Sequence, residues 1–258
     1  MGYEVIKIDI IILSYAKNNT LKSLTEQTIS SLINSEKPNE ISFNIIVIES
    51  EKTLAPYQFK HSVTLYPKES FGFHRYLNLG IKASSNAYIC LCNNDLIFQE
   101  NWASEILKAF NKNPKLKSAN PICINFEPTE RYLNNTKPVI ANRLNIFQGI
   151  LTGWCIFIDR EIIDKIGYLD EQFEFWYADR DYGMTLLKHK IQHALIPMAK
   201  VLHLANQSYD SIDQSKFNKL TSEQKLVFDK KWHNSLWSKL QFYLIGIYLR
   251  VKIKIGLH

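Results

Sequence analysis

The chain has 258 residues, of which 46% are hydrophobic and 22% are charged, an ordinary composition for a globular protein with one well-filled core. The net charge of +6 is concentrated in residues 216–258, which carry nine Lys/Arg and two Asp/Glu, while the remainder is almost neutral. This distribution argues against a basic domain that binds nucleic acid and indicates a local surface function for the tail.

The first residues carry no long apolar run behind a basic start, so we expect no signal peptide. No stretch reaches the ~18 uncharged apolar residues that a transmembrane helix needs. The cysteines, all in apolar surroundings, are Cys90, Cys92, Cys123 and Cys155. Their spacing does not fit a zinc site, so we predict buried, reduced thiols in a cytoplasmic protein.

Short β-branched apolar runs alternate with helical patterns in the first hundred residues. The predicted strands are 8–13, 43–48, 63–66 and 87–92, and the predicted helices begin near residues 21 and 73. This alternation predicts an α/β fold with a mostly parallel, doubly wound sheet and helices on both faces. In such sheets, ligands bind beyond the carboxyl ends of the strands.

Polar residues directly follow three of these strands. They are Ser14 and Tyr15, then Glu49, and then Asn93, Asn94 and Asp95. An aspartate at the end of a buried strand is costly unless a partner satisfies its charge. Asp95 is therefore either a ligand for a divalent metal or a turn residue, since Asn and Asp also favour turns.

The second half of the chain adds further candidates. Residues 149–158 predict a strand in which Gly153 allows close approach of a backbone or a ligand. A later strand ends at His203. The polar segment 125–148 is expected to be a lid over a binding site, a loop that contacts a substrate, or a plain surface excursion.

In this order, the segments from about Ile8 to Ser208 resemble the family-two inverting glycosyltransferases, which have the GT-A fold. The matching motifs are Asn78 with Gly80, Asn93-Asn94-Asp95, Asp159-Arg160-Glu161, Ile166 to Glu171, Asp179 with Asp181, and His203 with Ser208. Two positions depart from the family pattern. Ala178 replaces the usual Glu before Asp179, and Glu49 or Glu51 stands where a nucleotide-facing Asp is common.

The resemblance implies transfer of a sugar from a nucleoside diphosphate, of UDP or dTDP type, to a hydroxyl of a glycan or lipid-linked acceptor. It further implies a role in bacterial surface polysaccharide biosynthesis. Asp95 and His203 are expected to hold Mn²⁺ or Mg²⁺, which would stabilise the departing diphosphate. Taken alone, His203 is more simply a hydrogen-bonded structural histidine. Asp179 is the candidate base that takes the proton of the acceptor, with N-capping as its alternative role.

The remaining site residues fall into two groups. Donor contacts are predicted for Ser14, Tyr15, Glu49, Asn78, Asn93, Asn94 and Gly153, and acceptor contacts for Trp176, Tyr177 and Arg180. The alternative for the two aromatic residues is a place in the core, and for Arg180 it is a solvated surface position.

We predict a GT-A domain at 1–210, with a donor half at about 1–98 and an acceptor half at about 99–210, followed by basic helices at 211–258. Residues 217–232 predict an amphipathic helix. Residues 236–257 interleave aromatic, aliphatic and basic side chains and contain no acid. This last segment is expected to lie on an anionic membrane surface, on the catalytic domain or on a second subunit of a homodimer. The first option would place the protein peripherally on the cytoplasmic face of the inner membrane.

Three other functions compete with catalysis of sugar transfer. Ala178 favours a catalytically weak protein that only binds nucleotide sugars. The basic tail suggests a nucleic-acid-binding module, but nothing in the first 215 residues supports one. A nucleotidyltransferase would carry a glycine-rich loop after the first strand, whereas residues 14–20 contain no glycine.

Overall fold

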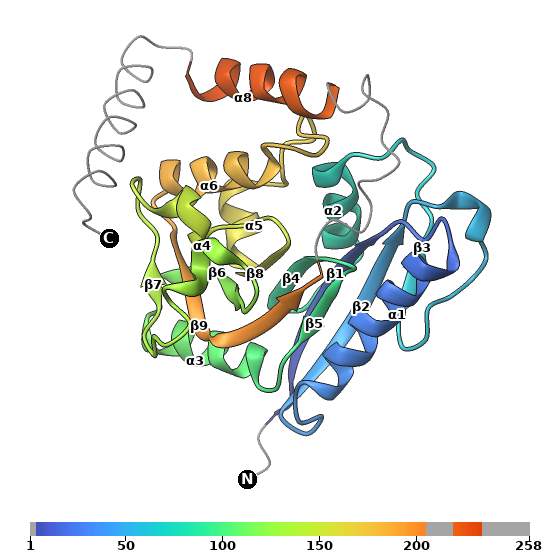
Figure 1. The fold of residues 1–258 in the computed structure, drawn as a ribbon, viewed down its shortest axis with the longest axis horizontal. Coiled ribbons are helices and arrows are strands. Elements are labelled where there is room, and N and C mark those ends of the chain that lie inside the picture. The colour runs from blue at the N-terminus through green and yellow to red at the C-terminus, as the bar shows by residue number, and fades with distance from the viewer. Residues whose placement is uncertain (1–3, 205–218, 234–258) are drawn as a thin grey trace.

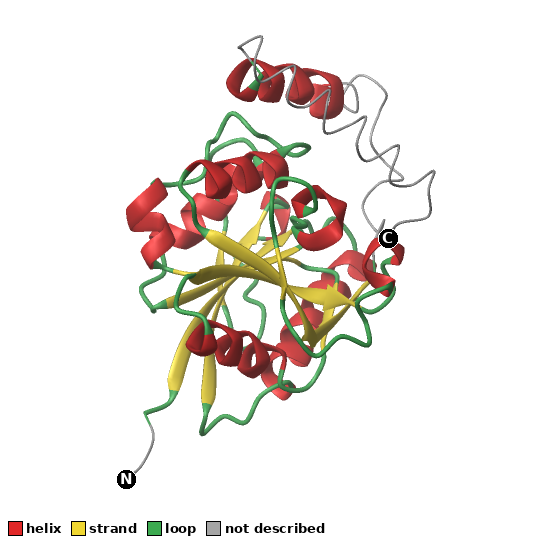
Figure 2. Cartoon of the chain, turned by 90° about the vertical axis from the view of Figure 1, so that its left-hand side faces the viewer, coloured by secondary structure: helices red, strands yellow, loops and turns green. Residues whose placement is uncertain are grey.

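The computed structural model describes residues 4–204 and 219–233. This part of the chain is built on a nine-stranded sheet with helices on both faces (Figures 1 and 2). The strands are β1 (Ile6–Ser14), β2 (Ile41–Glu49), β3 (Val63–Leu65), β4 (Tyr88–Asn93), β5 (Leu96–Phe98), β6 (Leu116–Cys123), β7 (Val139–Ile140), β8 (Cys155–Asp159) and β9 (Gln192–His203). The α-helices are α1 (Asn19–Asn34), α2 (Phe73–Lys82), α3 (Trp102–Lys112), α4 (Glu127–Glu130), α5 (Glu161–Ile166), α6 (Ala178–Lys188) and α8 (Gln224–Trp232).

The strand order is β3-β2-β1-β4-β8-β6-β9-β5, and β7 pairs with β9. β1, β2, β3 and β4 run parallel, whereas β8 runs antiparallel to both β4 and β6, and β5 and β7 run antiparallel to β9. The predicted α/β class is confirmed. The sheet is parallel over β1 to β4 and becomes mixed beyond β4, because β8 begins at the rim where β4 ends.

Alternating side chains of β1 supply two cores, one on each face of the sheet. Ile10 and Ile12 pack with α1 and α3 on one face. Ile11 and Leu13 pack with α2 and α6 on the other. This period of two is what a strand buried on both faces requires.

Gly80 allows α2 to lie close against β1. A methyl group at Gly80 would lie 2.3 Å from Cγ2 of Ile11, well inside van der Waals contact. The glycine of the Asn78–Gly80 motif is therefore explained by helix-to-sheet packing.

Asp9 links β1 to the residue that follows β8, at the edge of the sheet opposite the carboxyl ends of β1, β2 and β4. It is buried in β1 and accepts hydrogen bonds from the backbone amides of Ser85 and Asn86 at 2.9 and 2.7 Å. Arg160, which follows β8, donates to the same carboxylate at 3.0 Å. Arg160 of the Asp-Arg-Glu motif thus acts in this structure as a structural tie.

Two predictions of local structure need correction. Residues 149–154 are not a strand: Ile146–Ile150 forms a π-helical turn in which Gly149 has φ = 86°, so the strand begins only at Cys155. Within the predicted helix at 217–232, Lys219–Glu223 is a π-helical turn that leads into α8, and the regular α-helix is Gln224–Trp232. The polar segment 125–148 contains the short helix α4 and the short strand β7.

The cysteines are buried and free, as predicted, and burial raises the pKa values of the Cys90 and Cys92 thiols. Among the described residues, no helix is long and apolar enough to cross a membrane. Ser208 and the segment 236–257 lie outside the described residues, and the domain boundary at 210 stays a prediction.

Replacement of Gly80 by Ala is expected to lower the free energy of unfolding by about 1–3 kcal/mol, since the methyl group overpacks the contact with Ile11. Chemical denaturation measures the loss. The matched control is Gly72→Ala, where the new methyl group would meet only Arg75, at 3.4 Å. Equal stability of the two variants would contradict this account of Gly80.

Candidate active site

Asp95 and His203 meet at the rim of the sheet. Asp95 directly precedes β5, His203 ends β9, and the antiparallel register of these strands pairs Leu96 with His203. The backbone amide of Leu204 also donates to the carbonyl of Asp95 at 2.9 Å. As a result, Nε2 of His203 lies 3.2 Å from Oδ1 of Asp95. Two residues that are far apart in sequence are thus brought together, as predicted.

Helix α1 shapes the turn that carries Asp95. The hydroxyl of Thr28 donates to the carbonyl of Asn94 at 2.8 Å and accepts from the amide of Leu96 at 3.1 Å. The side chain of Asn94 donates to the hydroxyl of Thr25, which also contacts Ser14 at 2.8 Å. These bonds position the turn, and they engage the Asn94 amide and the Ser14 hydroxyl within the protein.

Asn125 holds the other half of the pair. Its side-chain amide donates to the carbonyl of His203 at 2.9 Å, and its side-chain oxygen accepts from the His203 amide at 3.3 Å. Asn125 was not among the predicted site residues. Its position, at the start of a polar segment after an apolar strand, carried no signal of a contact 78 residues away.

Trp154 covers the imidazole of His203. The two rings stack with centroids 5.5 Å apart and planes 25° apart. The carbonyl of Trp154 accepts from the amide of Asn93 at 2.9 Å, which ties it to the end of β4. Its indole Nε1 is buried and finds no hydrogen-bond acceptor among the described residues.

The Asp95–His203 pair fits a divalent cation. Oδ1 of Asp95 is buried and receives no hydrogen bond from any part of the chain that the structure describes, so His203 stands at ion-pair distance without hydrogen-bond geometry. A buried carboxylate oxygen without a donor is unfavourable, and a cation bound by both side chains would satisfy it. Within residues 4–204 and 219–233, no cluster of three or more His, Cys, Asp or Glu side chains could hold a metal. Further ligands would have to come from substrate and water.

Asp179 lies in the first turn of α6, next to Gly153. A methyl group at Gly153 would approach the Cβ of Asp179 to 3.3 Å, so the glycine leaves room for the aspartate beside the Gly153–Trp154 segment. Burial raises the pKa of Asp179, and a 2.8 Å hydrogen bond from the Arg180 amide offsets part of the increase. The structure therefore brings Asp179 to the segment that covers His203.

The predicted acceptor residues surround the start of α6. Trp176 is 43% exposed. Tyr177 adopts φ = 65°, a left-handed conformation that is uncommon for an aromatic residue. The guanidinium of Arg180 lies 5.4 Å from the ring of Tyr177 and 5.6 Å from that of Phe147. Contact of these side chains with an acceptor stays a prediction.

On the donor side, Glu49 connects the loops that follow β1 and β2. Its Oε1 accepts hydrogen bonds from the amides of Ala16 and Glu51 at 3.0 and 2.7 Å. Its Oε2 is buried and has no donor within the described residues. Tyr15, one residue beyond β1, is 43% exposed. Contact of Glu49 and Tyr15 with a donor stays a prediction.

Asn78 has a positioning role. Its side chain accepts from the amide of Leu169 at 3.0 Å and donates to the carbonyl of Leu169 and to Glu171 at 2.9 and 3.1 Å. Asn78 thus holds the Gly-Tyr-Leu-Asp-Glu loop of the second half against α2, and a direct contact with the donor stays a prediction.

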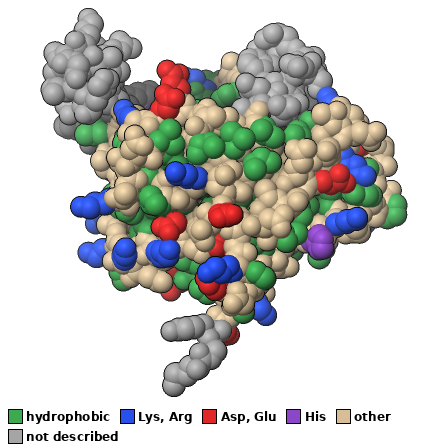
Figure 3. All heavy atoms as spheres, turned by 60° about the horizontal axis from the view of Figure 1, so that its bottom comes forward, with side chains coloured by type: hydrophobic (Ala, Val, Ile, Leu, Met, Phe, Trp, Pro, Cys, Tyr) green, Lys and Arg blue, Asp and Glu red, His purple; other side chains and the backbone are tan. Residues whose placement is uncertain are grey.

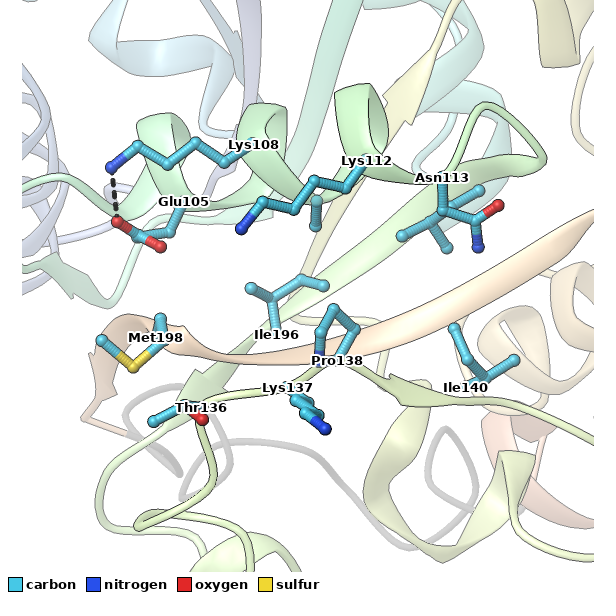
Figure 4. Close-up of a pocket in the computed structure, with 12 residues that line it drawn as sticks. Glu105, Lys108, Lys112, Asn113, Thr136, Lys137, Pro138, Ile140, Ile196 and Met198 are labelled. Carbon is cyan, nitrogen blue, oxygen red and sulfur yellow. Dashed lines mark hydrogen bonds and ion pairs between the residues drawn. The ribbon is translucent and has the colours of Figure 1, made fainter.

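A separate groove of about 350 Å³ lies between α3, β7 and β9 (Figure 4). Lys108 and Lys112 of α3 line one side of it, and Lys137, Ile196 and Met198 line the other side (Figure 4). In a space-filling view from the side of α3, basic side chains gather toward one edge among apolar ones (Figure 3). The described residues that line this groove include no predicted site residue, so we place the chemistry at the sheet rim.

Comparison with known proteins establishes the family. The sequence profile of Glycosyl transferase family 2 matches residues 9–167, more than half of the chain. The chain belongs to this family. The chain is also similar in structure to a solved protein, described as GalNAc-T7 with UDP, GalNAc and Mn²⁺, with a TM-score of 0.61 and 13% sequence identity. No curated protein matches the sequence.

This structural similarity covers 86% of this chain and 50% of the GalNAc-T7 chain, so the chain spans half the length of that protein. At 13% identity the similarity shows the fold, and it confirms the predicted GT-A architecture. The profile match includes Asp95 but ends before Asp179 and His203. The assignment of these two residues therefore depends on the geometry described above.

Proposed function

We propose that this glycosyltransferase moves a sugar, with inversion, from a UDP- or dTDP-type donor to a hydroxyl group, with the help of a divalent cation. The observation that carries the proposal is the 3.2 Å approach of His203 to an otherwise unsatisfied buried oxygen of Asp95. Asp179, which lies beside the Gly153–Trp154 segment, is the residue that we propose as the base.

Asp95 and His203 would hold the cation. The carboxylate is a hard oxygen ligand suited to Mg²⁺ or Mn²⁺, and the imidazole shifts the preference toward Mn²⁺. When bound, the cation neutralises the negative charge that develops on the leaving diphosphate. Thr28 and Asn125 keep the two ligands in place through the backbone, so little reorganisation is needed.

Asp179 would accept the proton of the attacking hydroxyl. Burial raises the pKa of its carboxyl group, which makes it a stronger base than a solvated aspartate. Attack from the face of the sugar opposite the diphosphate inverts the anomeric centre. Trp154, stacked on His203, would help to exclude water from the reacting atoms.

Glu49 supports a pyrimidine donor. Its Oε2 is a buried acceptor without a donor among the described residues, and the imide N–H of uracil or thymine would supply one. The exposed ring of Tyr15, at the end of the neighbouring strand, offers a surface on which a base can stack.

For the acceptor we propose a glycan or a lipid-linked glycan, in the synthesis of a bacterial surface polysaccharide. The exposed indole of Trp176 supports this choice, because aromatic faces bind sugar rings. The acid-free basic and aromatic sequence at 236–257 supports a site of action on the cytoplasmic face of the inner membrane.

A nucleotide-sugar-binding protein without turnover is the competing function, suggested by Ala178. In the structure, Ala178 is buried with Phe173 and Phe228, so packing accounts for the missing acid at this position. The catalytic proposal is therefore favoured.

Addition of UDP together with Mn²⁺ is expected to raise the melting temperature more than either ligand alone, since ligands that bind only the folded state stabilise it, by about 2.7 kcal/mol at 100 times Kd. Asp95→Asn and His203→Gln should each abolish the increment that depends on Mn²⁺. The matched control is His61→Asn, at an exposed loop position with φ = 59°, which asparagine tolerates. A Mn²⁺ increment that survives both substitutions would refute the metal site.

Asp179→Asn should lower kcat by about 10²–10⁴-fold, the usual contribution of a general base, while stabilisation by UDP is unchanged. In the unmodified enzyme, kcat/KM should fall as the pH drops through the raised pKa of Asp179, because the protonated carboxyl cannot accept a proton. Transfer from a panel of UDP- and dTDP-sugars measures both effects. Asp164→Asn, at an exposed position of α5, is the control. Full activity of Asp179→Asn would eliminate it as the base.

The full chain is expected to sediment with vesicles of anionic phospholipid at low salt and to be released at high salt, which screens the attraction. Replacement of Lys239, Arg250, Lys252 and Lys254 by Gln should prevent sedimentation. If the unmodified chain stays in the supernatant at low salt, the proposed membrane location is wrong.

A further inference from the structure

Helix α8 packs over α6 and over the segment that precedes α6 (Figure 1). The segment 170–177 connects the loop held by Asn78 to the first residue of α6. It carries Trp176 and Tyr177 and leads directly to Asp179. Helix α8 contacts this segment and the first turn of α6.

Lys231 of α8 ties the start of the segment to the first turn of α6. Its Nζ lies 2.7 Å from Oδ2 of Asp170 and 2.8 Å from Oδ1 of Asp181. Burial lowers the pKa of Lys231, but the hydrogen bonds to the two carboxylates outweigh burial and raise it. The ammonium group is therefore charged, and it bridges residues on either side of Trp176 and Tyr177.

Trp232 and Gln224 add one hydrogen bond each. The indole Nε1 of Trp232 donates to Oδ1 of Asp181 at 2.7 Å, and Asp181 is 2% exposed. The side-chain oxygen of buried Gln224 accepts from the backbone amide of Glu174 at 2.8 Å, in the middle of the segment. These two bonds restrict the path of the backbone at Glu174 and at the first turn of α6.

Phe228 supplies the apolar part of the contact. It is buried in a cluster with Phe173 and Ala178, and its ring lies 5.3 Å from that of Tyr177. Ala178, the residue that departs from the family pattern, thus forms part of the apolar surface on which α8 packs.

Tyr177 shows why the segment needs support. A non-glycine residue at φ = 65° is in a sparsely populated conformation, which persists only where neighbouring contacts impose it. Phe228 against its ring, and the tied residues on either side of it, are such contacts.

We propose that α8 positions the acceptor side of the active site: Lys231, Trp232 and Gln224 hold the segment 170–177 in the shape that presents Trp176, Tyr177 and Asp179 to the acceptor. This inference rests on the proposed function for its link to the acceptor. The three side chains of α8 are positioning residues, because they act through the segment and do not touch the reacting groups.

The test compares Lys231→Met, Lys231→Arg and Trp232→Phe with the unmodified chain. Hydrogen exchange should be faster in peptides that cover residues 170–182 for Lys231→Met and Trp232→Phe, with no change in peptides from β1 and β4. In transfer from UDP- and dTDP-sugars to a panel of p-nitrophenyl glycosides, Lys231→Met should raise the acceptor KM about tenfold, as expected for one charged hydrogen bond. The KM of the donor should stay unchanged, and Lys231→Arg should restore the acceptor KM.

The matched control is Lys230→Met, which removes a positive charge from an exposed position of the same helix next to Lys231. Unchanged exchange in residues 170–182 of Lys231→Met would overturn the proposal. An equal rise in the KM values of donor and acceptor would also overturn it, since it would indicate a general loss of structure. If the unmodified chain transfers no sugar at all, the proposed function fails, and the exchange comparison still decides whether α8 holds the segment.

Discussion

The candidate active site depends on the antiparallel pairing of β5 with the end of β9. This short ladder places Leu96 opposite His203 and so brings the carboxylate of Asp95 to the imidazole. Because side chains alternate between the faces of a sheet, a shift of one residue in this register would turn His203 to the opposite face. The geometry of the pair is thus set mainly by the backbone, with Thr28 and Asn125 as local supports.

The side chains in the first turn of α6 lie on two different faces of the helix. Ala178 and Asp181 are three residues apart and share the face that α8 covers. Asp179 points to a different side, where Gly153 leaves space for it. One short stretch of sequence can therefore anchor a helix and direct a carboxylate toward the Gly153–Trp154 segment, because helical geometry separates neighbouring side chains by about 100°.

The sequence was sufficient for the features that follow from local periodicity and from strand-end position. The parallel strands β1, β2 and β4 belong here. The approach of Asp95 to His203 was instead implied by the family resemblance, because neither periodicity nor spacing pairs these two residues. The turn at Gly149 was missed, because an apolar run with glycines fits a strand as well as a turn. The role of Lys231 could not be predicted either, since a lysine in a basic tail carries no sign of the carboxylates that it will meet in the folded chain.

The two sides of the site are held by different kinds of bond. Backbone pairing across a sheet fixes the Asp95–His203 side, and substitutions seldom disturb a ladder of this kind. The segment that bears Trp176 is held by a few side chains of a separate helix. Substitutions in α8 can therefore change the shape of the segment that bears Trp176 while the backbone ladder keeps Asp95 and His203 together.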